Sequence, residues 1–356
     1  MALEIDARDQ LLQSLRGRTL RIPDLPALLQ HWPQYVNLEL DRLRRHVDTK
    51  LQELFPEGER LKKTRAADAG LFAASWWPYA RFEALTIATY LSIWLFVWDD
   101  ELDSAEFSSL VLDHSRASAF RAETLDFAER CLMVDRQQCT TDAPTNAIIA
   151  SFRPIGEAIS KSCSAHQVET FLKELRFFIE MTGVEQQVQM SKKLPSVDEY
   201  YQRRKGSSAV RMCLAITEYC FGMGIPTNVM NDNDMETIWN ETNMIIAGMN
   251  DLLSVRKEIM QDQVDSLIPL LYVQHGTLEA ATEDLMETLK AAIAAFEEAS
   301  KRLLDRYFSD PETHRKLLQF IHGCQCACTA NLNWSIGSGR YKLGTRSLSG
   351  GMQVKL

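Results

Sequence analysis

Apolar positions recur every three to four residues along most of the chain, which is the spacing of amphipathic helices, and no convincing alternating run predicts a strand. Proline and glycine interrupt the pattern, for example at residues 56–58 and 222–226, and leave helical segments of ordinary length. No linker rich in proline, glycine or serine divides the chain. We therefore predict an all-α fold with a single domain over residues 1–356, a bundle of about ten helices around a cavity. The ends, about 1–20 and 342–356, are expected to be loose.

One segment is apolar nearly all round. Residues 85–98, LTIATYLSIWLFVW, are interrupted only by threonine and serine, so as a helix they belong in the centre of the bundle. These fourteen residues are fewer than the roughly twenty that cross a bilayer, so no membrane span is predicted.

Four acidic residues follow this segment within five positions: Asp99, Asp100, Glu101 and Asp103. On a helix Asp99 and Asp103 share one face, where like charges repel and a bound cation would relieve the repulsion. The alternative is that the acids mark the solvated end of a core helix.

A second polar group lies in the sequence NDLLSVRKE at 250–258. At 100° per residue Asn250, Ser254 and Glu258 fall in one stripe of a helix. An amide oxygen, a hydroxyl and a carboxylate suit Mg²⁺ or Mn²⁺, and with a single carboxylate the metal expects a phosphate to complete its shell. Lys257 would bind that phosphate as a point charge. The alternative is an ordinary polar face of an amphipathic helix.

Charge and composition limit the partners. The net charge is −9 and the isoelectric point is near 5.4, which argues against a nucleic acid or an anionic membrane surface. An anionic substrate must therefore be met by locally placed cations. The sequence MALEIDARDQ does not resemble a signal peptide, so a cytoplasmic location with eight reduced cysteines is expected. No oligomeric state is predicted.

Two basic groups carry little information by themselves. Arg203 and Arg204 form a pair that is typical of a solvated helix face. Arg340 and Tyr341 place a cation and a phenol where the helical pattern ends, after Trp334 and a glycine-rich turn.

Together these groups resemble the microbial class I terpene synthases, and the fungal sesquiterpene synthases in particular. The resemblance rests on DDELD at 99–103, NDLLSVRKE at 250–258, an arginine 46 residues before Asn250, and the Arg340–Tyr341 pair. It covers about residues 31–341, and the order of the motifs is similar too.

The resemblance implies a role for each motif residue. Asp99 would bridge two Mg²⁺ ions with Asp103 nearby, and the helix stripe would bind the remaining ion, making three, with Mn²⁺ able to substitute. The residues implied to contact the substrate diphosphate are Arg204, Lys257, Arg340 and Tyr341. Arg203 remains a rival to Arg204. The chain departs from its relatives at residues 205–208, Lys-Gly-Ser-Ser, where an Asp or Thr followed by Gly is more usual.

The implied reaction is that of a sesquiterpene cyclase: farnesyl diphosphate is ionised, the carbocation cyclises, and a terpene hydrocarbon or alcohol is released with diphosphate. Phe96 and Trp334 are expected to face the carbocation, although buried aromatic residues are often ordinary core. Two alternative functions would show a different set of residues. A chain-elongating prenyltransferase would carry a second aspartate-rich motif in place of the Asn-Ser-Glu stripe. A non-catalytic module that binds isoprenoid diphosphates would be expected to have lost one of the metal-binding residues, and none is missing here.

Overall fold

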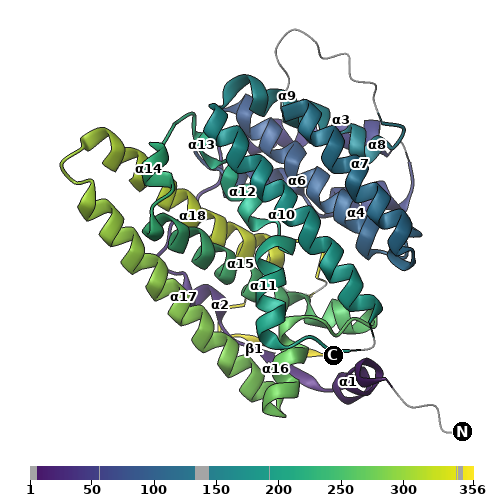
Figure 1. The fold of residues 1–356 in the computed structure, drawn as a ribbon. Coiled ribbons are helices and arrows are strands. Elements are labelled where there is room, and N and C mark those ends of the chain that lie inside the picture. Colours follow the sequence, from purple (N-terminus) through teal and green to yellow (C-terminus); the bar gives the residue numbers. More distant parts are fainter. Residues whose placement is uncertain (1–5, 56, 133–143, 192, 342, 344–347) are drawn as a thin grey trace, which may run out of the picture.

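The computed structural model describes residues 6–55, 57–132, 144–191, 193–341, 343 and 348–356, and nearly all of its regular structure is helical, as predicted (Figure 1). The helices are α1 (Ala7–Leu15), α2 (Leu25–Leu28), α3 (Leu40–Leu54), α4 (Glu59–Ala66), α5 (Ala69–Trp76), α6 (Phe82–Asp103), the short 3₁₀ helix η1 (Leu110–Leu112), α7 (His114–Leu132), α8 (Ala147–Ala150), α9 (Arg153–Ser162), α10 (Ala165–Met190), α11 (Val197–Ser207), α12 (Val210–Ala215), α13 (Thr217–Phe221), α14 (Thr227–Met230), α15 (Asn233–Met260), α16 (Leu267–His275), α17 (Leu278–Arg306) and α18 (Pro311–Gly337). The strands are β1 (Thr19–Ile22) and β2 (Met352–Lys355).

The helices form a ring around a central space. Helix α5 packs against both α6 and α18, α18 packs against α15, and α12 joins α15 to α10. In Figure 1, α6, α7, α9 and α10 make one side of the bundle, and α15, α17 and α18 make the other. The residues that line the cavity come from both groups, for example Phe96 of α6 and Asn250 of α15.

Helix α6 contains the apolar segment that the sequence places in the centre. Most of its side chains are buried, among them Trp94 and Trp98, so the predicted central position is confirmed. The acidic residues occupy its last turns, up to the final residue Asp103. Among the described residues, no helix is both long enough and apolar enough to cross a membrane.

Helix α15 carries the Asn-Ser-Glu stripe in its last turns. It begins at the N-cap Asp232, whose side chain accepts a hydrogen bond from the backbone of Asp234. Along its length it packs against α17 and α18, which hold it rigidly in the second group of helices. The predicted helix over residues 250–258 is therefore confirmed.

The ends of the chain are not loose where the structure describes them. Helix α1 is followed by β1, which pairs antiparallel with β2 in the register Thr19↔Lys355 to Ile22↔Met352. In β1 only Leu20 and Ile22 are buried, so its alternation is too short to stand out in a sequence. Residues 1–5, 342 and 344–347 of the predicted ends lie outside the described residues.

Candidate active site

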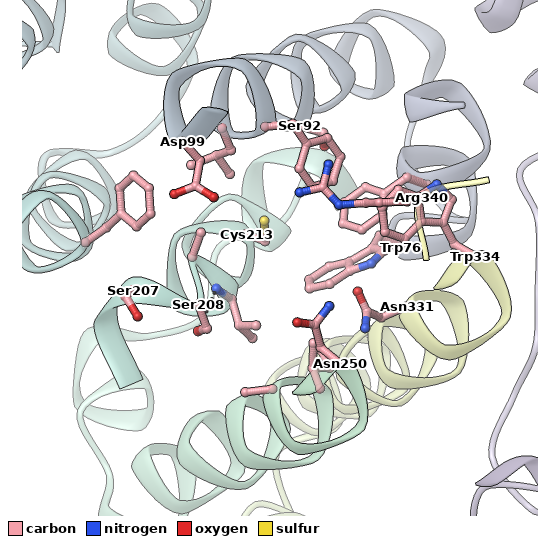
Figure 2. Close-up of a pocket in the computed structure, with 18 of the residues that line it drawn as sticks. Trp76, Ser92, Asp99, Ser207, Ser208, Cys213, Asn250, Asn331, Trp334 and Arg340 are labelled. Atoms are coloured by element: carbon pink, nitrogen blue, oxygen red, sulfur yellow. Dashed lines mark hydrogen bonds between the residues drawn. The ribbon is translucent and has the colours of Figure 1, made fainter. Parts of the chain in front are cut away.

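A cavity of about 140 Å³, partly open to solvent, lies inside the ring of helices (Figure 2). The polar residues of its lining include Asp99, Arg204, Asn250, Arg340 and Tyr341, and much of the remaining wall is apolar or aromatic. Figure 2 shows Asp99 on α6 and Asn250 on α15 on opposite sides of this space. The fold thus brings together residues that are far apart in the chain and were predicted to share a site.

The aspartate side of the cavity concentrates negative charge. Asp99 lines the cavity, whereas Asp103, one turn later, is exposed and accepts a hydrogen bond of 3.3 Å from Gln189 Nε2. Burial raises the pKa of Asp99 well above its ordinary value, and the neighbouring carboxylates of Asp103 and Glu185 raise it further. Carboxylates that disfavour one another's ionisation in this way suit a divalent cation.

The Asn-Ser-Glu side offers a second set of oxygen donors. Asn250 lines the cavity, and Ser254 Oγ donates a hydrogen bond of 2.6 Å to Glu258 Oε1. The other carboxylate oxygen of Glu258 is buried, and no well-aligned hydrogen bond reaches it from the described residues. Burial, followed by the charge of Asp251, raises the pKa of Glu258 to about 7. A bound cation would satisfy this oxygen and favour the ionised carboxylate.

The two candidate arginines of α11 lie in different surroundings. Arg204 lines the cavity, and its Nη2 donates to Asn250 Oδ1 at 3.0 Å and to Asp251 Oδ1 at 3.1 Å. Arg203 does not line the cavity; it forms an ion pair with Glu185 at 3.6 Å. Its side chain is only 3% exposed, so the expected solvated face is wrong for Arg203, because it lies against α10. Geometry therefore favours Arg204 as the residue that meets a ligand.

Further basic groups gather near Asn250. Asn250 Nδ2 donates a hydrogen bond of 2.6 Å to the phenol oxygen of Tyr341, and the guanidinium of Arg340 lies 4.9 Å from the ring centre of Phe96. Lys257 is not among the residues that line the cavity. Burial, together with the charge of Arg340, lowers the pKa of Lys257. Because these positive charges lie close together and repel one another, an anion bound between them would be stabilised.

Aromatic rings form the wall behind these groups. Phe96 and Trp334 stack with ring centres 5.4 Å apart and planes inclined by 3°, and Phe72 meets both rings edge-on. Trp334 is fixed because its Nε1 donates a 2.5 Å hydrogen bond to the carbonyl of Ala67. Phe72 and Trp76 were not singled out from the sequence, although both line the cavity. The aromatic density of LFAASWW was the available signal.

The chain breaks its helical course where the sequence departs from its relatives. Between α11 and α12, Ala209 adopts a left-handed backbone with φ of 59°, which an alanine rarely accepts. Ser208 Oγ donates to Asn243 Oδ1 at 2.6 Å, and the hydroxyl of Ser207 is buried near the carboxyl of Glu185. All three residues line the cavity, so the helix break faces the ligand space.

The arrangement of helices is shared with solved terpene synthases. α-Eudesmol synthase superposes with a TM-score of 0.74 at 17% identity, covering 86% of this chain and 98% of that one. A cucumene synthase variant gives a TM-score of 0.73 at 18% identity, covering 87% and 98%. The fold is therefore the class I terpenoid synthase fold.

Sequence comparison extends this likeness to the family. The family described as "Terpene synthase family 2, C-terminal metal binding" matches residues 90–295. The sesquiterpene cyclase hepA of Aspergillus oryzae is 31% identical, over 96% of this chain and 94% of its own length. The terpene cyclase braA of Annulohypoxylon truncatum is 24% identical, over 95% and 90%. The chain belongs to the terpene synthase family, and it is an enzyme of that type.

Proposed function

We propose that this enzyme is a sesquiterpene cyclase that ionises farnesyl diphosphate and cyclises the carbocation before releasing diphosphate. The observation that carries the proposal is one cavity lined both by charged and polar groups, among them Asp99, Asn250 and Arg340, and by aromatic rings, among them Phe96 and Trp334. The first set suits a diphosphate, and the second suits an isoprenoid chain. The similarity to a fungal sesquiterpene cyclase supports a C15 substrate.

The donor set fits Mg²⁺. The residues that would hold it are Asp99, Asp103, Asn250, Ser254 and Glu258, three ions in all, with Mn²⁺ able to substitute. The raised pKa values of Asp99 and Glu258, and the buried carboxylate oxygen of Glu258, support this fit. When bound, the metal supplies positive charge to the leaving diphosphate.

The chain's own cations would bind the same leaving group. The residues assigned to diphosphate are Arg204, Lys257, Arg340 and Tyr341. Arg204 is held in place by Asn250 and Asp251, so its guanidinium is preorganised and loses little entropy on binding. Donors fixed in advance stabilise charge that develops as the C–O bond breaks.

The carbocation that remains needs a wall without a nucleophile. Phe96, Trp334 and Phe72 present such a wall, and an aromatic face stabilises a desolvated cation by about 2 kcal/mol. The T-shaped and stacked contacts fix the three rings relative to one another, so they hold the shape in which the cation folds.

A product assay tests the proposal. The purified protein is incubated with Mg²⁺ and, separately, with the C10, C15 and C20 diphosphates, and products are identified by gas chromatography and mass spectrometry. A cyclic C15 product that disappears with a chelator is expected. A longer diphosphate would identify a prenyltransferase, and no product from any substrate would overturn the proposal.

A further inference from the structure

Arg8 of the N-terminal helix joins two segments at the mouth of the bundle. Its guanidinium donates to both carboxylate oxygens of Asp265, in the loop between α15 and α16, and its Nη2 donates to the carbonyl of Val188 at 2.7 Å. Val188 lies in the last turn of α10. The Arg8 side chain is 15% exposed and that of Asp265 is 7%, so the ion pair is largely shielded from water.

Each of these two segments holds part of the candidate active site. Beside Val188, Gln189 donates to Asp103, at the end of the aspartate-rich motif. The Asp265 carbonyl accepts a 3.2 Å hydrogen bond from Arg203, the residue before Arg204. Arg8 is therefore connected through Gln189 to Asp103 at the end of the aspartate-rich motif, and through Asp265 to Arg203, which precedes the cavity residue Arg204.

A third contact closes this network. Glu185, one turn before Val188 on α10, forms the ion pair with Arg203. Two arginines thus connect the end of α10 with the loop after α15: Arg203, which lies within the bundle, and Arg8, which belongs to the N-terminal helix. Arg8 is more than 250 positions away from Asp265 in the sequence.

We propose that Arg8 is a positioning residue that fixes the distance between the aspartate-rich wall and the Asn-Ser-Glu wall, so that both meet one metal–diphosphate group. The proposal rests on the function proposed above. A planar guanidinium bound at both ends of its fork fixes orientation as well as charge, which an ammonium group cannot do. A displacement of about 1 Å at a catalytic site costs about a hundredfold in rate.

Arg16 provides a matched control. It follows the same helix α1 and forms an ion pair with Asp262 in the same loop. These side chains are 51% and 67% exposed, and in the described part of the chain Arg16 makes no hydrogen bond or ion pair with α10. Removing Arg16 therefore removes a charge and a contact to the loop without separating the two walls.

The test compares Arg8→Ala, Arg8→Lys and Arg16→Ala with the wild-type protein, using farnesyl diphosphate and a titration of Mg²⁺. We expect Arg8→Ala to lower kcat/KM by about 10- to 100-fold and to raise the half-saturating Mg²⁺ concentration. Arg8→Lys should recover only part of the loss, and Arg16→Ala should stay within about twofold of wild type. Circular dichroism and thermal melting confirm that each variant is folded at the assay temperature.

A double-mutant cycle separates positioning from stability. Asp265→Asn should reproduce the loss of Arg8→Ala, and the double variant should lose little more, because both substitutions break one contact. A lower melting temperature with unchanged kinetics and Mg²⁺ dependence would show a merely structural role and would overturn the proposal.

Calorimetry with Mg²⁺ and inorganic diphosphate distinguishes this proposal from the proposed function. If the wild type binds diphosphate but yields no product from any isoprenoid substrate, the sesquiterpene assignment fails. Weaker diphosphate binding by Arg8→Ala than by Arg16→Ala would still support the positioning role, and equal binding by the two would overturn it. If the wild type neither turns over nor binds, both proposals are overturned.

Discussion

The guanidinium of Arg204 lies in the cavity wall, whereas that of Arg203 lies beside Glu185 behind the same helix. We expect Arg204→Lys to lower kcat by about 100- to 1,000-fold, because a fixed donor to developing charge is lost. Arg203→Lys should instead lower the free energy of unfolding by about 1–3 kcal/mol, with a smaller effect on rate. Steady-state kinetics and urea denaturation measure the two effects. If Arg203→Lys loses most of its activity and Arg204→Lys remains fully active, the diphosphate-binding arginine is Arg203 and not Arg204.

Asp99 and Asp103 also differ at the scale of single residues. Asp99 lines the cavity among other carboxylates, and Asp103 is exposed at the helix end. Replacing either by asparagine keeps the shape and removes one charge, so Asp99→Asn should lose at least about tenfold more activity than Asp103→Asn. Initial rates at saturating Mg²⁺, with circular dichroism as a control for folding, make the comparison. Equal losses would show that the two carboxylates share one role.

At the scale of helices, the start of α15 is joined to α17 by a charge cluster. Arg302 Nε and Arg306 Nη2 donate to the carboxylate of Asp234 at 2.9 and 2.8 Å. Burial opposes ionisation of Asp234, but the hydrogen bonds and charges of both arginines outweigh it and lower the pKa of the carboxyl. A lowered pKa means that the stabilisation is present above the ordinary aspartate pKa and is lost as the pH falls through the folded-state value.

Asp234→Asn should therefore destabilise the protein at pH 7 by about 1–3 kcal/mol, nearer the lower figure because both arginines are about half exposed. The difference from wild type should begin to shrink as the pH falls below about 4, because the carboxyl of the unfolded chain is protonated there first. It should disappear once the pH is below the lowered pKa of the folded state. Urea titrations at several pH values measure it. A difference that stays constant down to pH 3 would show that the charge is not responsible.

Local pattern predicted the elements that carry the motifs, and packing decided the rest. The run before Asp99 indicated a buried helix, and the four-residue spacing of Asn250, Ser254 and Glu258 placed their side chains on one stripe. The choice between Arg203 and Arg204 depends on which face of α11 packs against α10. In a short polar helix the pattern of apolar residues does not predict that face. The described parts of the chain ends pair across almost the whole sequence, and no local signal encodes that partner.

For the whole molecule, metal binding and diphosphate binding are expected to depend on one another. The protein carries a net charge of −9, but the stripe at Asn250 has only one carboxylate to bind a metal ion. The buried cation Lys257, whose pKa is lowered by burial and by Arg340, would be stabilised by an anion beside it. Mg²⁺ alone should bind weakly, and Mg²⁺ with inorganic diphosphate should bind tightly and raise the melting temperature. At 100 times the dissociation constant the stabilisation is about 2.7 kcal/mol.

Isothermal calorimetry and thermal melting check this expectation. Tight stoichiometric binding of Mg²⁺ to the ligand-free protein would contradict it, and so would a melting temperature that diphosphate raises equally in the presence of a chelator.

The strand pair β1–β2 joins the two described ends of the chain and so closes the polypeptide into one long loop. Thr19 pairs with Lys355, and the backbone N–H of Gly17 donates to the carbonyl of Leu356. The entropic cost of closing a loop rises only with the logarithm of its length, so two short strands suffice to hold it. Such a small sheet is the kind of unit that opens without global unfolding. Arg340 and Tyr341 lie within this closed loop, 12 and 11 residues before β2 begins at Met352. We therefore expect mild denaturant to release the part of the chain that carries Arg340 and Tyr341, which are proposed to bind diphosphate, and so to abolish activity while the surrounding helices remain folded.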